Sequence, residues 1–190
     1  LDPTAELRVF ELKGSGDLSA LEKVAHTYGS GLDDQTIAAC VDTLRQVVDE
    51  ELPRRIKTIA GLPKDLCPEN KVTPELAARR TLGLHPLVVV IDECQNLITH
   101  PIHGRTAGEL CEKLIKLGRA FGLILILATQ RPDASSLPPG VSANAGIRFC
   151  LRVMGQVEND MVLGTSMYKH GIRATTFTAR DKGIGYLVGA

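Results

Sequence analysis

The chain has 190 residues, of which 44% are hydrophobic and 23% charged, enough for one domain with a substantial core. Its 22 basic and 22 acidic residues balance, which excludes a basic field over the whole chain but leaves a local nucleic-acid patch open. Five scattered cysteines without a Cys-x-x-Cys pair, and no apolar run of roughly 18 residues, indicate buried thiols in a cytoplasmic protein.

The first elements alternate between strand and helix patterns. Residues 6–12 alternate apolar with charged side chains and predict a strand, and a short helix is expected after Asp17. Asp33 or Asp34 is expected to cap the next helix, whose apolar residues recur at spacings of three and four. Pro53 is expected to kink or interrupt this helix.

The segment from residue 61 to 74 contains three prolines and predicts a surface excursion. Basic residues frame it, and they fit a solvated helix face as well as they fit phosphate contacts to DNA or across a subunit boundary. These residues are Arg54, Arg55, Lys57, Arg79 and Arg80.

Residues 86–96 are the stretch around which the chain is organised. The five apolar residues 87–91 show no alternation, which is typical of a parallel strand buried on both faces. This strand ends on Asp92 and Glu93, at the edge where open α/β sheets bind ligands. In nucleotide hydrolases this is the Walker B position, where the aspartate acts on Mg²⁺ and a glutamate activates water. The alternative is a core strand that leaves the sheet through a polar turn.

A helix from about residue 106 to 119 and a second apolar strand, 123–127, complete a βαβ unit with parallel strands. Asp92, Glu93, Thr129 and Gln130 are therefore expected to converge at one edge of the sheet. An amide beside the acid pair is suited to bond a γ-phosphate or the attacking water, which favours a nucleotide hydrolase. Further strands are predicted at 149–154 and 182–188 around a helix at 156–163, all within one domain.

A phosphate loop of the form G-x-x-x-x-G-K-[ST] is absent from the sequence, so a hydrolase interpretation lacks half of its site. The chain begins at Leu1 without an initiator methionine, and we interpret it as part of a longer protein.

Three stretches, residues 88–93, 125–132 and 142–149, resemble the motor domain of the FtsK/SpoIIIE family, which belongs to the FtsK/HerA group of RecA-like ATPases. Residues 10–14 and 148–153 are closer to the TraB-type plasmid-transfer translocases of actinobacteria. The resemblance covers nearly the whole chain. It implies an α/β fold, a RecA-like P-loop NTPase core with a mostly parallel central sheet, truncated at the N-terminal side. Residues 1–190 would then form the Walker B half of a motor domain without its Walker A part.

The resemblance also implies roles for individual residues. Asp92 would hold Mg²⁺ through water, Glu93 would be the catalytic base, and Gln130 would sense the γ-phosphate of ATP with Thr129 beside it.

Two arginines match family positions that act on the site of a neighbouring subunit. Arg55 matches one in the helix before the excursion, and Arg148 matches one after the Asn-containing run. The residues leave the choice between them open, and Pro53 is a departure from the family pattern.

The implied function is an ATP-driven double-stranded DNA translocase in DNA transfer or segregation, as in conjugation or cell division. It would act as a homo-oligomer, a hexameric ring, and reach a membrane only through segments outside this chain. ATPase activity is expected of the full-length protein and is open for this chain alone. The alternatives are a type VII secretion-type ATPase that moves protein, and a non-catalytic fragment that only oligomerises or binds DNA.

Overall fold

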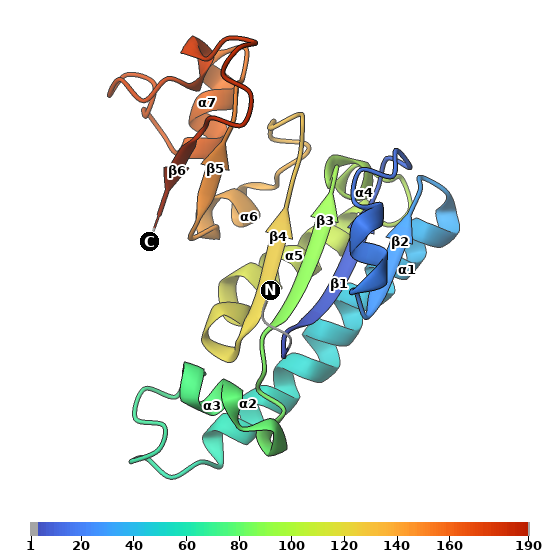
Figure 1. Cartoon of the computed structure of the whole chain (residues 1–190), viewed down its shortest axis with the longest axis vertical. Coiled ribbons are helices and arrows are strands. Elements are labelled where there is room, and N and C mark those ends of the chain that lie inside the picture. Colours follow the sequence, from blue (N-terminus) through green and yellow to red (C-terminus); the bar gives the residue numbers. More distant parts are fainter. Residues whose placement is uncertain (1–3, 190) are drawn as a thin grey trace. The chain divides into compact units, whose positions relative to one another are not determined.

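The computed structural model describes residues 4–189, which divide into two compact units, residues 4–129 and residues 130–189 (Figure 1). Each unit has its own sheet and its own buried residues. The assignment of the whole chain to a single motor domain stays a prediction.

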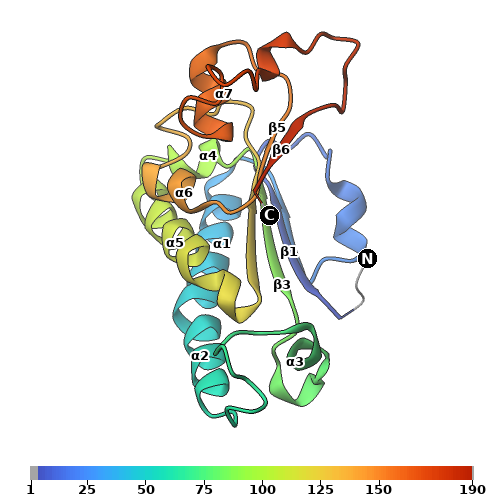
Figure 2. The same cartoon turned by 90° about the vertical axis from the view of Figure 1, so that its left-hand side faces the viewer.

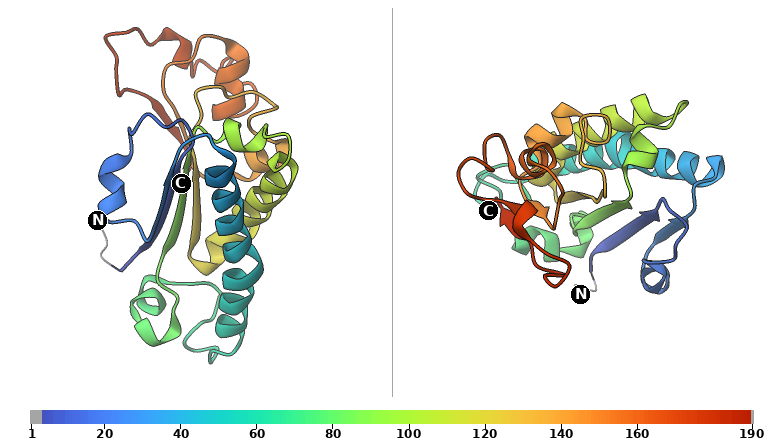
Figure 3. Two further views of the ribbon diagram at one scale, coloured as in Figure 1. Left: turned by 90° about the vertical axis from the view of Figure 1, so that its right-hand side faces the viewer. Right: turned by 90° about the horizontal axis from the view of Figure 1, so that it is seen from above.

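The first unit is built on a parallel four-stranded sheet with the strand order β2-β1-β3-β4, which confirms the α/β class and the predicted βαβ unit. Its strands are β1 (Glu6–Glu11), β2 (Thr27–Ser30), β3 (Leu87–Asp92) and β4 (Leu123–Leu127). Seen from above, the strands follow one another across the sheet from blue through green to yellow (Figure 3, right). All four carboxyl ends lie at the same edge because every pairing is parallel.

One face of this sheet is covered by long helices, which stand on one side when the sheet is seen edge-on (Figure 2). They are α1 (Asp34–Arg45), α2 (Leu52–Ala60) and α5 (Gly104–Leu117). As expected, Asp33 caps α1, since its carboxylate accepts the backbone N–H of Thr36 at 2.9 Å. The buried stripe of α1 includes Ile37, Val41 and Leu44, at the spacing that the sequence predicts.

Pro53 does not interrupt the helix, contrary to the expectation. A π-helical segment, Gln46–Glu51, joins α1 to α2, and the N–H of Leu52 bonds to the carbonyl of Val47. Proline lacks an N–H and crowds the carbonyl four residues before it. The wider π turn accommodates both effects, so the chain passes Pro53 as one long helix.

The opposite face of the sheet is less covered than an unbroken apolar strand predicts. Val89 and Ile91 of β3 are fully buried, but Val88 and Val90, which point the other way, are only partly so. On β4, Ile124 and Ile126 are 45% and 47% exposed. The prediction of burial on both faces for residues 87–91 is therefore wrong, since in the described residues Val88 and Val90 are only partly buried.

Short elements complete the first unit. They are 3₁₀ turns at Ser19–Lys23, Arg80–Leu82 and Gly118–Phe121, and the short helices α3 (Pro74–Ala78) and α4 (Gln95–Ile98). The segment predicted as a surface excursion contributes Cys67 to a small core, in which it is buried with Ile59, Leu76 and Leu84 from the flanking residues.

The second unit contains an antiparallel pair of short strands, β5 (Arg148–Cys150) and β6 (Tyr186–Val188), with α6 (Pro139–Asn144) and α7 (Gln156–Leu163). Both strands are shorter than predicted, since the chain leaves the sheet after Cys150 and rejoins it only at Tyr186. The core of the unit gathers around Cys150, Leu163 and Ala174.

The five cysteines are buried free thiols, in agreement with the sequence. Among residues 4–189, none of the helices has the length and apolar character that crossing a membrane requires.

Candidate nucleotide site at the carboxyl edge of the parallel sheet

Asp92 is the last residue of β3, and its carboxylate is partly exposed at the carboxyl edge of the sheet. It pairs in register with Glu11 at the end of β1, so both side chains point to the same face. Burial raises the pKa of Asp92, and the negative charges of Glu93, Glu11 and Asp17 raise it further. A partly desolvated carboxylate among other carboxylates is an environment that favours a bound cation.

Glu93 follows Asp92 in an unusual backbone conformation. Its φ is +54°, in the left-handed region that non-glycine residues rarely adopt, at a cost of about 1–3 kcal/mol. The turn leaves its side chain only 4% exposed, and its Oε2 accepts a hydrogen bond of 2.6 Å from Nε2 of Gln95.

Gln95 links the acid pair to the end of β4. Its Oε1 accepts a hydrogen bond of 2.7 Å from the hydroxyl of Thr129. The backbones also meet there, since the N–H of Cys94 donates to the carbonyl of Ala128 at 2.9 Å. Asp92, Glu93 and Thr129 thus lie at one edge of the first unit, as the βαβ unit predicts. Sequence reasoning missed Gln95, although a polar residue two positions after the acid pair was a signal for it.

Glu11 is a second residue of this edge that the sequence did not single out. Its side chain is fully buried, and each carboxylate oxygen accepts one backbone N–H and one hydroxyl. Oε1 accepts from N and Oγ of Ser15, and Oε2 accepts from N of Gly16 and Oγ of Ser30, all at 2.8–3.0 Å. Glu11 therefore fixes the Lys13–Asp17 turn beside Asp92. The only sign of this role in the sequence was a charged residue near the end of a strand in which apolar and charged residues alternate.

Gln130 begins the second unit, directly after Thr129 in the chain, and its side chain is exposed. Its convergence with Asp92 and Glu93 stays a prediction.

Curated relatives of this chain are DNA translocases. It is 29% identical to DNA translocase FtsK 2 of Neisseria meningitidis serogroup A over 164 residues, which cover 77% of this chain. The chain is thus similar to the motor ATPases of the FtsK/SpoIIIE type. It spans only 16% of the length of that relative. No protein-family model matches the chain.

Two solved structures have the same fold as this FtsK-type chain. The conjugation coupling protein TcpA, in its monomer form with ATPγS, matches with a TM-score of 0.63 and 24% identity over 86% of this chain and 46% of its own. The type VII secretion ATPase EccC of Thermomonospora curvata matches with a TM-score of 0.68 and 23% identity over 99% of this chain and 21% of its own. At these identities the likeness establishes the fold alone.

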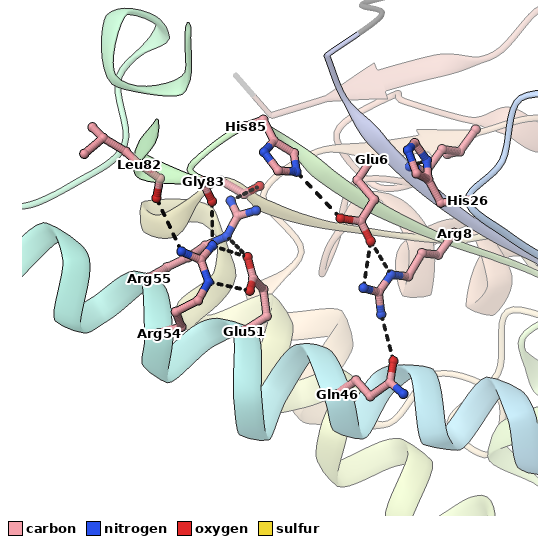
Figure 4. Close-up of polar contacts among 12 residues, drawn as sticks. Glu6, Arg8, His26, Gln46, Glu51, Arg54, Arg55, Leu82, Gly83 and His85 are labelled. Carbon is pink, nitrogen blue, oxygen red and sulfur yellow. Dashed lines mark hydrogen bonds and ion pairs between the residues drawn. The ribbon is translucent and has the colours of Figure 1, made fainter. Parts of the chain in front are cut away.

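Arg55 lies at the other end of the sheet from the FtsK-type acid pair. Its side chain is fully buried and donates to Glu51 at 2.6 Å and to the carbonyl of Phe121 at 2.9 Å, just before β4 begins. Arg54 donates to the same Glu51 and to the carbonyl of Gly83 (Figure 4). A guanidinium held in this way would have to leave these acceptors to reach a neighbouring subunit, so the action of Arg55 there stays a prediction.

Arg148, the other arginine that matches the FtsK-type pattern, begins β5 in the second unit and is partly exposed. Its Nε donates to the carbonyl of Ala145 at 3.2 Å, and its Nη2 donates to the carbonyl of Ser142 at 2.5 Å. Both acceptors lie within six residues of Arg148, so these contacts orient the guanidinium locally. Its action on a neighbouring subunit stays a prediction.

Mg²⁺ fits the acid pair only in company with a nucleotide. Within the described part of the chain, no three His, Cys, Asp or Glu side chains are arranged to hold a metal ion by themselves. Mg²⁺ in nucleotide hydrolases uses one or two carboxylates, with phosphates and waters as the other ligands. The carboxylate of Asp92, partly exposed at this edge with Glu93 next to it, matches that donor set.

Proposed function

We propose that this chain is part of an ATP-driven motor that translocates double-stranded DNA. The observation that carries the proposal is the acid pair at the carboxyl end of β3, with Glu93 held in place by Gln95 beside the end of β4. Similarity to curated DNA translocases supports DNA as the cargo.

In this function, ATP with Mg²⁺ supplies the phosphoryl group and neutralises charge that develops during its transfer. Asp92 holds the metal through water, and the carboxylate of Glu93 takes a proton from the attacking water. Gln130 bonds the γ-phosphate, with Thr129 beside it on the adjoining strand end. A P-loop, which residues 1–190 lack, belongs to another segment of the full-length protein.

An arginine of a neighbouring subunit completes such a site, because guanidinium stabilises negative charge in the transition state. Of the two candidates, the burial of Arg55 favours Arg148 for this role. The requirement for a neighbour makes a homo-oligomeric ring, a hexamer, part of the proposal. The wider process is DNA transfer, as in conjugation, or DNA segregation in the cytoplasm during cell division, with any membrane attachment made by segments outside this chain.

ATP turnover by the full-length protein, with and without duplex DNA, tests the proposal. We expect DNA to stimulate turnover. Glu93→Gln should lower kcat by about 10²–10⁴-fold while ATP still binds, because the amide cannot accept the proton. Glu109→Gln, an exposed change on α5, is the matched control and should behave as wild type. A protein without ATP turnover in the presence of DNA would overturn the proposal, and full turnover in Glu93→Gln would overturn the role of Glu93.

The fold is shared with the type VII secretion ATPase EccC, so protein cargo is the second candidate. Stimulation by a secreted peptide, and none by duplex DNA, would favour it. A protein that binds DNA or oligomerises without hydrolysing ATP would instead be a non-catalytic member of the fold.

A further inference from the structure

Three side chains form a continuous hydrogen-bonded relay at the carboxyl edge of the sheet. The hydroxyl of Thr129 donates to Oε1 of Gln95 at 2.7 Å, and Nε2 of Gln95 donates to Oε2 of Glu93 at 2.6 Å. An ionised carboxylate can only accept hydrogen bonds, so the NH₂ group of Gln95 must face Glu93. The oxygen of the amide is then left for the hydroxyl. The two contacts therefore fix the same orientation of the Gln95 side chain.

We propose that Gln95 is a positioning residue, which ties the carboxylate of Glu93 to the end of β4 and makes turnover depend on Thr129. The inference rests on the proposed function, because it gives Gln95 a part in the activation of water by Glu93. Gln95 itself need not touch ATP.

The geometry explains why Glu93 needs such a partner. A glutamate side chain has three rotatable bonds, so it loses much conformational entropy when it is held in one position. The backbone at φ +54° turns Glu93 into the protein, and the Gln95 amide holds one of its two oxygens. A displacement of about 1 Å in a catalytic group can lower a rate by about 10²-fold.

The relay also gives Thr129 an indirect effect on Glu93. The hydroxyl of Thr129 carries a single proton, which in this structure goes to Gln95. While that proton stays on Oε1 of Gln95, the amide is held at both of its ends. The position of the base at the end of β3 therefore depends on the hydroxyl at the end of β4.

Steady-state kinetics of the full-length protein with duplex DNA test this relay. We expect Gln95→Ala to lower kcat at least tenfold with the KM for ATP within twofold, because Glu93 loses its position and the nucleotide keeps its contacts. Thr129→Val removes the hydroxyl at constant size and should lower kcat likewise, whereas Thr129→Ser restores it. The double variant should be no worse than the more impaired single one. Gln35→Ala, an exposed change on α1, is the matched control.

Two results would overturn the inference: a raised KM with unchanged kcat in Gln95→Ala, or additive losses in the double variant. If the wild-type protein does not hydrolyse ATP, the proposed function fails, and the relay is then tested without nucleotide. In glutamine-labelled protein, the side-chain N–H signals of Gln95 should shift in Thr129→Val and in Glu93→Gln but not in Thr129→Ser. Unshifted signals in the first two variants would exclude the relay.

Discussion

Glu11→Gln is the substitution that most sharply tests how the carboxyl edge of the sheet is built. Oε1 of Glu11 accepts the backbone N–H and the hydroxyl of Ser15. Oε2 accepts the backbone N–H of Gly16 and the hydroxyl of Ser30. Whichever way a glutamine amide turns, its NH₂ group must face one of these N–H groups, which cannot turn away. Hydrogen bonds to a charged acceptor contribute about 1.5–3 kcal/mol each, so we expect a loss of about 2–4 kcal/mol in the free energy of unfolding.

The same hydrogen bonds also make the free energy of unfolding depend on pH. Burial alone would raise the pKa of Glu11, but hydrogen bonds from Ser15, Ser30 and Gly16 outweigh it and lower the pKa from 4.5 to about 2. Because the pKa is lower in the folded state, this stabilisation is complete above about pH 4.5 and is lost as the pH falls toward 2. A shift of this size corresponds to about 3 kcal/mol, and it arises from the same hydrogen bonds that Glu11→Gln removes.

Urea unfolding followed by circular dichroism at pH 7 and pH 3 measures both effects. The wild type should lose part of its stability between these pH values, and Glu11→Gln should lose less, since its side chain does not titrate. Glu22→Gln, an exposed change in the 3₁₀ turn nearby, is the control and should match the wild type. A Glu11→Gln protein within about 0.5 kcal/mol of the wild type at pH 7 would refute the reasoning, because that is the range of neutral surface changes.

Two further substitutions test single buried groups. Arg55→Ala should lower the free energy of unfolding by about 1–3 kcal/mol in urea, because the carbonyls of Phe121 and Gly122 lose their donor while Glu51 keeps Arg54; a loss of under about 0.5 kcal/mol would argue against the structural role. Asn159→Ala should destabilise the second unit by about 1–3 kcal/mol, because Ala174 loses the acceptor of its N–H. Hydrogen exchange at Ala174 measures this directly, and unchanged protection would contradict it.

Periodicity was sufficient to predict the long elements of the first unit. Apolar residues recur at helical spacing in α1 and α5 and form unbroken runs in β3 and β4. Each of these elements can therefore be recognised from its own sequence. β2 was missed because it has only four residues, and it is defined by its pairing with β1 rather than by its own pattern. The π segment before Pro53 was missed for a related reason, since the rule for proline assumes an unaltered α-helical ladder.

The site was predictable at the level of the backbone and not at the level of side chains. Parallel strands bring their carboxyl ends to one edge, so the positions of Asp92 and Thr129 follow from the βαβ unit. The contact between Gln95 and Glu93 depends on a backbone turn with φ of +54°, which the residue types do not encode. The burial of Arg55 likewise depends on carbonyl groups 66 and 67 residues further along the chain.

The two ends of the parallel sheet use charge in opposite ways. At the amino end, Arg55 is buried against Glu51, so its charge is compensated within the protein. At the carboxyl end, Asp92, Glu93 and Glu11 have no lysine or arginine partner in any ion pair of residues 4–189. Burial and the negative charges of its neighbours raise the pKa of Asp92, and a carboxylate perturbed in this way is typical of functional sites. In the proposed function, the Mg²⁺ ion that accompanies ATP would supply positive charge here, which favours this edge over the arginine cluster as the place for ATP.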